Sequence, residues 1–190
     1  MTALHREIAA CTVCAAHLAH APRPVVQFSA SSRLAIVGQA PGSRVRASGV
    51  PWDDDSGARL RDWTGLTLEQ LHDPAVVALV PMGFCYPGKA KGGDLPPRKE
   101  CAPLWHDRIW QATSGLRLTL LVGTYAQAAY LPETKGMTLA DRVRAFESFL
   151  PRHLPLPHPA WRSTLFMRAN PWFEAELVPM LRERVAAALA

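Results

Sequence analysis

The sequence contains no long apolar run and no segment of the kind that directs export. Its 190 residues include no stretch approaching the ~20 apolar residues that a membrane-spanning helix requires. The first residues, MTALHREIAACTVC, lack the basic start and extended apolar core of a secretory signal. We therefore expect a cytoplasmic protein that does not cross a membrane. The chain also has no internal repeat or low-complexity segment, which predicts a single domain over residues 1–190.

Charged residues are scarce, at 19% of the chain, whereas apolar residues make up 48%, which excludes a disordered chain and predicts a globular one. The charges are also unbalanced, because 21 Lys and Arg against 16 Asp and Glu give a formal net charge of +5. A basic balance favours a polyanionic partner such as a nucleic acid, since binding phosphates releases counterions.

Cysteine occurs only four times, as Cys11, Cys14, Cys85 and Cys101. Without an export signal, these thiols are expected to stay reduced rather than to pair as disulfides. The first two form a C-x-x-C pair that can reach one metal centre, and the other two complete a set of four ligands. We favour a shared metal over four unrelated buried thiols. The spacing matches neither a ferredoxin run nor a zinc ribbon, so it leaves both zinc and an iron–sulfur cluster open.

Apolar runs alternate with amphipathic segments, which predicts an α/β fold: a three-layer sandwich with a central, mostly parallel sheet flanked by helices. The expected strands are 33–38, 76–84, 118–123 and 154–158. The expected helices are 3–20, 57–64, a short one near Leu68, 98–113, 125–131, 139–149 and 171–188, the last capped by Asn170. The segments 39–56 and 86–97 are expected to be loops. In such sheets the site lies at the carboxyl ends of the strands, which places the loops after Gly38, Phe84 and Pro157 on one rim.

Three segments on this rim carry chemistry. Gly38-Gln-Ala-Pro-Gly42 follows the first strand, and a glycine-bounded turn there exposes backbone amides to a ligand. Downstream, Trp52 precedes the three carboxylates Asp53, Asp54 and Asp55, and far along the chain His158-Pro-Ala160 follows an extended stretch. Taken singly, the first segment also fits a plain turn, the second an acidic helix cap, and the third a hydrogen-bonded loop histidine.

Together and in this order, these segments and the four cysteines resemble the uracil-DNA glycosylase superfamily, most closely its iron–sulfur branch, called family 4. GQAPG is similar to that branch's GEAPG motif, and His158-Pro-Ala160 is similar to its HPS or HPA motif. The cysteines fall where the branch has its cluster ligands. The resemblance therefore implies a uracil-DNA glycosylase-like fold and a [4Fe–4S] cluster rather than zinc.

The resemblance also implies a function in DNA repair, in which uracil or another deaminated base is excised and an abasic site remains. His158 would stabilise the departing base, Trp52 would stack on it, and the polar edge of the base would meet Gly38, Gln39, Ala40 and Gly83. Asp54 is our choice for the carboxylate that orients water, and Gln39 can position water but is a poor base. The candidate phosphate contacts of a monomer on DNA are Arg44, Arg46, Lys89, Lys91 and Arg162. Tyr86 and Trp161 are candidate wedges, although packing under the loops is the simpler expectation for both.

Two departures from the family pattern motivate an alternative. Gln39 replaces the glutamate of the first motif, and the stretch Pro81-Met-Gly-Phe-Cys85 has no asparagine before the third cysteine. The alternative is a DNA-binding protein of the same fold that excises no base. A hydrolase of small substrates is a more distant alternative, and the absence of a convincing G-x-S-x-G elbow counts against one large class of these.

Overall fold

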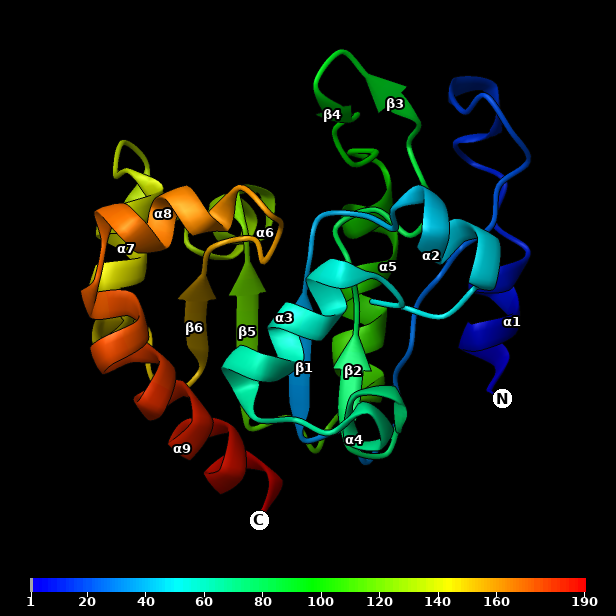
Figure 1. Ribbon diagram of the computed structural model, residues 1–190. Coiled ribbons are helices and arrows are strands. Elements are labelled where there is room, and N and C mark those ends of the chain that lie inside the picture. The colour runs from blue at the N-terminus through cyan, green and yellow to red at the C-terminus, as the bar shows by residue number, and fades with distance from the viewer. Residues whose placement is uncertain (1) are drawn as a thin grey trace.

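Residues 2–190, described by a computed structural model, fold around a four-stranded parallel sheet (Figure 1). The strand order is β2 (Val77–Leu79), β1 (Leu34–Val37), β5 (Leu118–Val122) and β6 (His153–Leu156). Every pairing is parallel, with Leu34 opposite both Val77 and Leu118. A separate antiparallel hairpin joins β3 (Lys89–Ala90) to β4 (Gly93–Asp94). The predicted α/β fold with a central, mostly parallel sheet is confirmed.

Short helices connect these strands, and the longest, α5 and α9, have twelve residues each. Within residues 2–190, none is both long and apolar enough to cross a bilayer. The α-helices are α1 (Ala3–Ala9), α2 (Ser43–Ser48), α3 (Asp55–Thr64), α4 (Leu68–His72), α5 (Cys101–Ala112), α6 (Thr124–Tyr130), α7 (Leu139–Arg144), α8 (Ser163–Ala169) and α9 (Val178–Leu189). Four further turns are the 3-10 helices η1 (Ala15–His17), η2 (Pro132–Thr134) and η3 (Phe146–Phe149), and the π-helical η4 (Phe173–Leu177).

The sheet is buried on both faces, because alternate residues of each strand point to opposite sides. Leu34 and Ile36 of β1 pack with α3 and α9 in one core cluster. Ala35 packs on the other face with α1 and α5, and Val37 packs there with α6. This arrangement gives the three predicted layers. Four tryptophans of the flanking segments pack in or against these clusters: Trp63, Trp105, Trp110 and Trp172.

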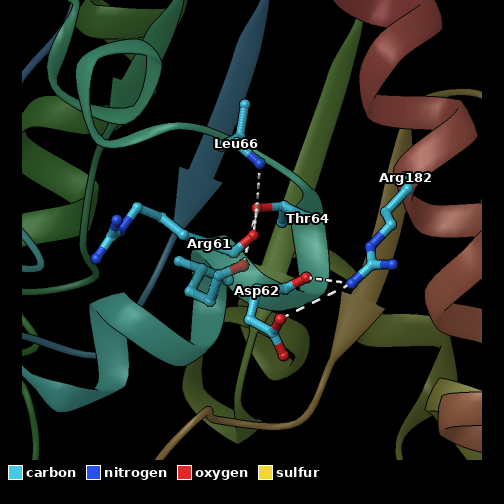
Figure 2. Close-up of polar contacts among 6 residues, drawn as sticks. Arg61, Asp62, Thr64, Leu66 and Arg182 are labelled. Atoms are coloured by element: carbon cyan, nitrogen blue, oxygen red, sulfur yellow. Dashed lines mark hydrogen bonds and ion pairs between the residues drawn. The ribbon is translucent and has the colours of Figure 1, made fainter.

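The end of α3 is tied to α9 by polar contacts, drawn in Figure 2. Arg182 donates to the backbone carbonyl of Asp62 at 2.7 Å. The hydroxyl of Thr64 donates to the carbonyl of Leu60 at 2.8 Å and accepts from the N–H of Leu66 at 3.5 Å. Gly65 ends the helix with a φ of 73°, which a residue without a β-carbon adopts at no steric cost. These contacts fix the helix that begins at the cavity described below.

A buried polar cluster lies on the opposite face of the sheet, between α5 and α6. The ring of His106 contacts the carbonyl of Pro81 through Nε2 at 3.0 Å and the hydroxyl of Tyr130 through Nδ1 at 2.6 Å. The indole N–H of Trp110 donates to the same hydroxyl at 2.8 Å. Burial lowers the pKa of His106 and raises that of Tyr130. The histidine is therefore neutral inside the fold at neutral pH.

The predicted extents of several elements were wrong: the helix expected over 139–149 ends at Arg144, and the strand expected over 76–84 ends at Leu79. The helix expected over 3–20 ends at Ala9, so Cys11 and Cys14 lie in the turns beyond it. The residues between them present no apolar face to the core, since Val13 is 58% exposed, and a helix continuing there would gain no packing. The expected loops 39–56 and 86–97 also contain regular structure, namely α2 and the β3–β4 hairpin.

The last helix also differs from the prediction. The side chain of Asn170 donates to the carbonyl of Phe166, so it closes α8 instead of capping the next helix. The segment that follows is the π-helical turn η4, and regular α-helix begins only at Val178. Pro179 has no N–H to give to the preceding turn, which accounts for the irregular hydrogen bonding there.

Candidate active site

A cavity of about 740 Å³ opens at the carboxyl end of the sheet, the end to which the strand arrows point in Figure 1. Its walls come from the loop after β1, the loop after β6, the β3–β4 hairpin and the segment leading into α3. The predicted rim of loops after Gly38 and Pro157 is confirmed. The loop after Phe84 reaches the same cavity through its hairpin, at residues 90–94.

Trp52 lies across the first motif. A β-carbon placed on Gly38 would be 2.8 Å from Cζ2 of Trp52, so the indole rests directly on the backbone of Gly38. Trp52 has a φ of 58°, a left-handed conformation that bulky residues rarely adopt. The carbonyl oxygen of Trp52 occupies the place that a β-carbon at position 57 would take, so only glycine fits there. The ring of His72 contacts the carbonyl of Pro51, the preceding residue, at 2.9 Å. The neighbours thus hold a strained backbone that places an aromatic ring in the cavity wall.

His158 follows β6 by two residues and faces the same ring. The centroids of the His158 and Trp52 rings are 5.9 Å apart, with the planes tilted by 32°. A β-carbon on Gly123, at the end of β5, would touch Cβ of His158 at 3.5 Å, so the two strand ends fix the position of the imidazole. Burial lowers the pKa of His158, and the charges of Asp54 and Asp94 partly oppose that shift. The imidazole is therefore neutral at neutral pH and can donate a hydrogen bond.

The three consecutive carboxylates have different positions. Asp54 caps α3, since its Oδ1 accepts from the N–H of Gly57 at 2.9 Å, and it lines the cavity. Asp55 is 98% exposed and pairs with Arg44 at 3.0 Å. Asp53 is exposed and is not among the lining residues. Of the three, only Asp54 is placed as predicted.

Sequence reasoning missed a further carboxylate, Asp94 of β4. It lines the cavity and acts electrostatically on His158. A β-carbon on Gly42 would be 3.8 Å from Oδ2 of Asp94 and 3.8 Å from Oδ2 of Asp54, so the two carboxylates flank the first motif. The sequence Gly92-Gly-Asp94 is typical of a tight turn, and it is the feature from which a hairpin at this position could have been predicted.

The first motif itself borders the cavity. Gly38, Gln39 and Ala40, the predicted base contacts, line the cavity, and the side-chain amide of Gln39 donates to the carbonyl of Leu95 at 3.4 Å. The prediction for Gly83 is wrong. Its N–H donates to the carbonyl of Gln39 at 3.0 Å, and the residue lies behind the motif, against Pro97, outside the cavity lining.

The order and placement of these residues agree with one family. Residues 25–182 match the family model of the uracil DNA glycosylase superfamily. The chain belongs to this superfamily. Membership indicates a DNA glycosylase, which is a hydrolase. The matched range begins after Cys11 and Cys14, so the match by itself does not distinguish the iron–sulfur branch.

In this superfamily member, the predicted phosphate contacts divide into two groups. Lys91 and Arg162 line the cavity, and Lys89 is exposed on the same hairpin. Arg162 also donates to the carbonyl of Gly92 at 2.7 Å, which joins the loop after His158 to the tip of the hairpin. The others lie elsewhere: Arg44 is engaged by Asp55, and Arg46 is half-buried and outside the cavity lining.

The two candidate wedges differ as well. Tyr86 is buried, stacks on His20 and places its hydroxyl 3.5 Å from Oδ1 of Asp94, so the simpler expectation of packing holds for it. That expectation is wrong for Trp161, which is 71% exposed at the edge of the cavity, with the guanidinium of Arg162 over its ring. Trp161 is therefore an exposed aromatic side chain at the edge of the cavity.

The four cysteines come together from three parts of the chain: the turns after α1, the residue before the hairpin loop and the first residue of α5. Each of them acts electrostatically on the other three, which requires the four sulfurs to be neighbours. Burial raises the pKa of Cys14 and Cys85, and raises that of Cys101 to about 12. The N–H of Phe84 points at Sγ of Cys101 at 3.3 Å.

The positions of the four thiols do not define a site for one metal ion. Among residues 2–190, no three His, Cys, Asp or Glu side chains converge closely enough to hold a single metal. The donor set, four cysteine thiols, is the one that an iron–sulfur cluster takes. The N–H of Phe84 directed at a sulfur matches the hydrogen bonds that tune such clusters.

Proposed function

We propose that the protein is a monofunctional DNA glycosylase that hydrolyses the N-glycosidic bond of uracil, or of another deaminated base, and leaves an abasic site. The observation that carries the proposal is the indole of Trp52, lying on Gly38 and next to the ring of His158 in the cavity wall. An enzyme of this kind must take its base out of the stack, at a cost of a few kcal/mol. Stacking on Trp52 recovers about 1–3 kcal/mol of that cost.

His158 acts on the leaving group. As the bond to the sugar breaks, negative charge gathers on the base, and a neutral imidazole donates a hydrogen bond to it as an oxyanion-hole group does. Asp54 and Asp94 place negative charge on the same side of the cavity, where positive charge develops on the sugar. Among the described cavity-lining residues the one lysine is Lys91, which is exposed on the hairpin. A Schiff-base nucleophile is normally desolvated or set beside another cation, so this position favours hydrolysis by water.

The DNA would lie over the cavity mouth. Lys89, Lys91 and Arg162 surround it with positive charge, which suits the backbone of a flipped nucleotide. Trp161 stands beside them and would fill the space that the extruded base leaves in the duplex.

Cleavage of a uracil-containing oligonucleotide by alkali, after incubation with the protein, tests this function. The wild type is expected to give alkali-labile sites. His158→Ala is expected to lower the rate about 10²–10³-fold, the loss typical of one oxyanion donor. Lys135→Ala, at an exposed position outside the cavity lining, is the control and should keep the wild-type rate. DNA binding without any product from uracil, hypoxanthine or xanthine would establish the alternative, a non-excising DNA-binding protein.

We also propose that Cys11, Cys14, Cys85 and Cys101 hold a [4Fe–4S] cluster. Its part would be structural, since it would staple the turns after α1 to the start of α5, beside the hairpin. Anaerobically purified protein is then expected to be brown and to contain about four irons and four sulfides per chain. Cys85→Ser should lose iron and melt earlier, whereas Thr12→Ser, between the first two cysteines, should change neither. One zinc per chain in place of iron would overturn the cluster but not the glycosylase.

A further inference from the structure

The cavity contains a carboxylate that the family resemblance does not supply. Asp94 comes from the β3–β4 hairpin, in a segment that is otherwise rich in glycine. Its Oδ2 would be 3.8 Å from a β-carbon placed on Gly42. It acts electrostatically on His158, and both residues line the cavity. Asp94 thus faces the same space as the imidazole and the Trp52 ring.

The surroundings hold the backbone of Asp94 in place. The side chain of Gln39 donates to the carbonyl of Leu95, the next residue, at 3.4 Å. The N–H of Leu95 donates to the carbonyl of Gly88 at 2.8 Å, which closes the hairpin. On the other side, Arg162 donates to the carbonyl of Gly92 at 2.7 Å. The hairpin is therefore anchored by the first motif and by the loop after His158.

Asp54, the other carboxylate, is less suited to accept a proton. Its Oδ1 already accepts a hydrogen bond from the N–H of Gly57 at 2.9 Å, as the N-cap of α3. The hydroxyl of Tyr86 lies 3.5 Å from Oδ1 of Asp94, at the limit of a hydrogen bond. Asp94 is also exposed, so water reaches it.

We propose that Asp94 is the catalytic carboxylate that orients and deprotonates the attacking water, and that Gln39 is a positioning residue that holds its strand. This inference rests on the proposed glycosylase function. The water oxygen bonds to C1′ of the sugar while one of its protons passes to Asp94. The electron pair of the C1′–N bond leaves with the base, whose anion is held by His158. The base then takes up a proton, and Asp94 returns its own to solvent.

The test compares Asp94→Asn, Asp54→Asn and Asp55→Asn under single-turnover conditions on a uracil-containing oligonucleotide. Each change removes one charge at nearly constant volume. Asparagine also caps helices well, so Asp54→Asn keeps α3 intact. Asp94→Asn is expected to lower the rate about 10²–10⁴-fold, as loss of a general base does, and to flatten the acidic limb of the pH–rate profile. Asp55→Asn, the matched control outside the cavity lining, should keep the wild-type rate.

Binding separates a catalytic role from a structural one. An oligonucleotide carrying 2′-fluoro-2′-deoxyuridine, whose glycosidic bond resists hydrolysis, should bind Asp94→Asn within about threefold of wild type, since only the reaction is affected. Asp94→Glu should recover part of the rate, and Gln39→Ala should lower the rate without changing the pH profile.

The outcomes distinguish the two proposals. A wild type that excises uracil, with Asp94→Asn within threefold of it, overturns the role of Asp94 and leaves the glycosylase in place. A slow Asp94→Asn variant with equally weakened binding makes the residue a DNA contact and also overturns the proposal. A wild type that excises no base overturns both.

Discussion

The contact between Gly38 and Trp52 gives a sharp prediction, because the first motif leaves no room for a side chain there. In Gly38→Ala the new methyl carbon would lie 2.8 Å from Cζ2 of Trp52. Carbon atoms pack at about 3.5–4.0 Å, so the indole must retreat by at least roughly 0.7 Å. Gly38 has no positive φ, and alanine is therefore not strained by the backbone itself.

Overpacking of this kind costs about 1–3 kcal/mol, and about 2–4 °C of melting temperature per kcal/mol is typical of a chain of this length. Gly38→Ala is therefore expected to melt about 2–12 °C below the wild type. The displaced ring would also stack less well on a flipped base, so binding of the 2′-fluorouridine oligonucleotide should weaken. Circular dichroism melts and a fluorescence titration measure the two effects.

A double-mutant cycle decides whether the indole is the cause. In a Trp52→Ala background the ring is absent, so Gly38→Ala should lower the free energy of unfolding by less than about 0.5 kcal/mol. Independent sites deviate from additivity by about this amount. A coupling energy of about 1–3 kcal/mol is expected in the full cycle. If the two changes prove additive, the ring does not rest on Gly38, and the account of Trp52 as the base-stacking wall is refuted.

Three further predictions follow from other contacts. Burial lowers the pKa of His106, so below about pH 6.5 the unfolded chain binds a proton that the folded chain does not, and stability is lost as the pH falls. His106→Gln should reduce the slope of unfolding free energy against pH by up to about 1.4 kcal/mol per pH unit; an unchanged slope contradicts the assignment. Trp161→Ala should slow excision from duplex DNA about 5–100-fold, the effect of one stacked aromatic, and from single strands less; equal losses would exclude a wedge. Gln39→Glu, which restores the family's carboxylate, should slow excision because it cannot donate to the carbonyl of Leu95; a faster enzyme would contradict the positioning role.

Much of the fold follows from local pattern in the sequence. The segment of β1 is a continuous apolar run, and that of β5 has only Thr119 among four apolar residues, because a strand buried on both faces needs no polar alternation. His158 could be placed at the carboxyl end of a strand for the same reason, since Leu154 and Leu156 mark β6 as buried. These predictions need only the apolar pattern within each strand, and no knowledge of which distant segments the strand contacts.

Features that depend on tertiary contacts were beyond such reasoning. The strands β3 and β4 have two residues each and no apolar pattern, and their hairpin is held by Gln39 and Arg162 from distant segments. Asp94 was missed because its place in the cavity depends on those contacts. The end of α1 at Ala9 was missed because it depends on what the next turn packs against.

The position of Asp94 offers a physical reason for the departure at Gln39. Asp54 and Asp94 already flank Gly42, each with Oδ2 within reach of one point beside the motif. A third carboxylate at position 39 would add like-charge repulsion beside these two. An amide at that position adds no charge, and it can donate to the carbonyl beside Asp94. If Asp94 is the base, as proposed above, glutamine at position 39 supports the strand that carries this carboxylate without repelling its charge.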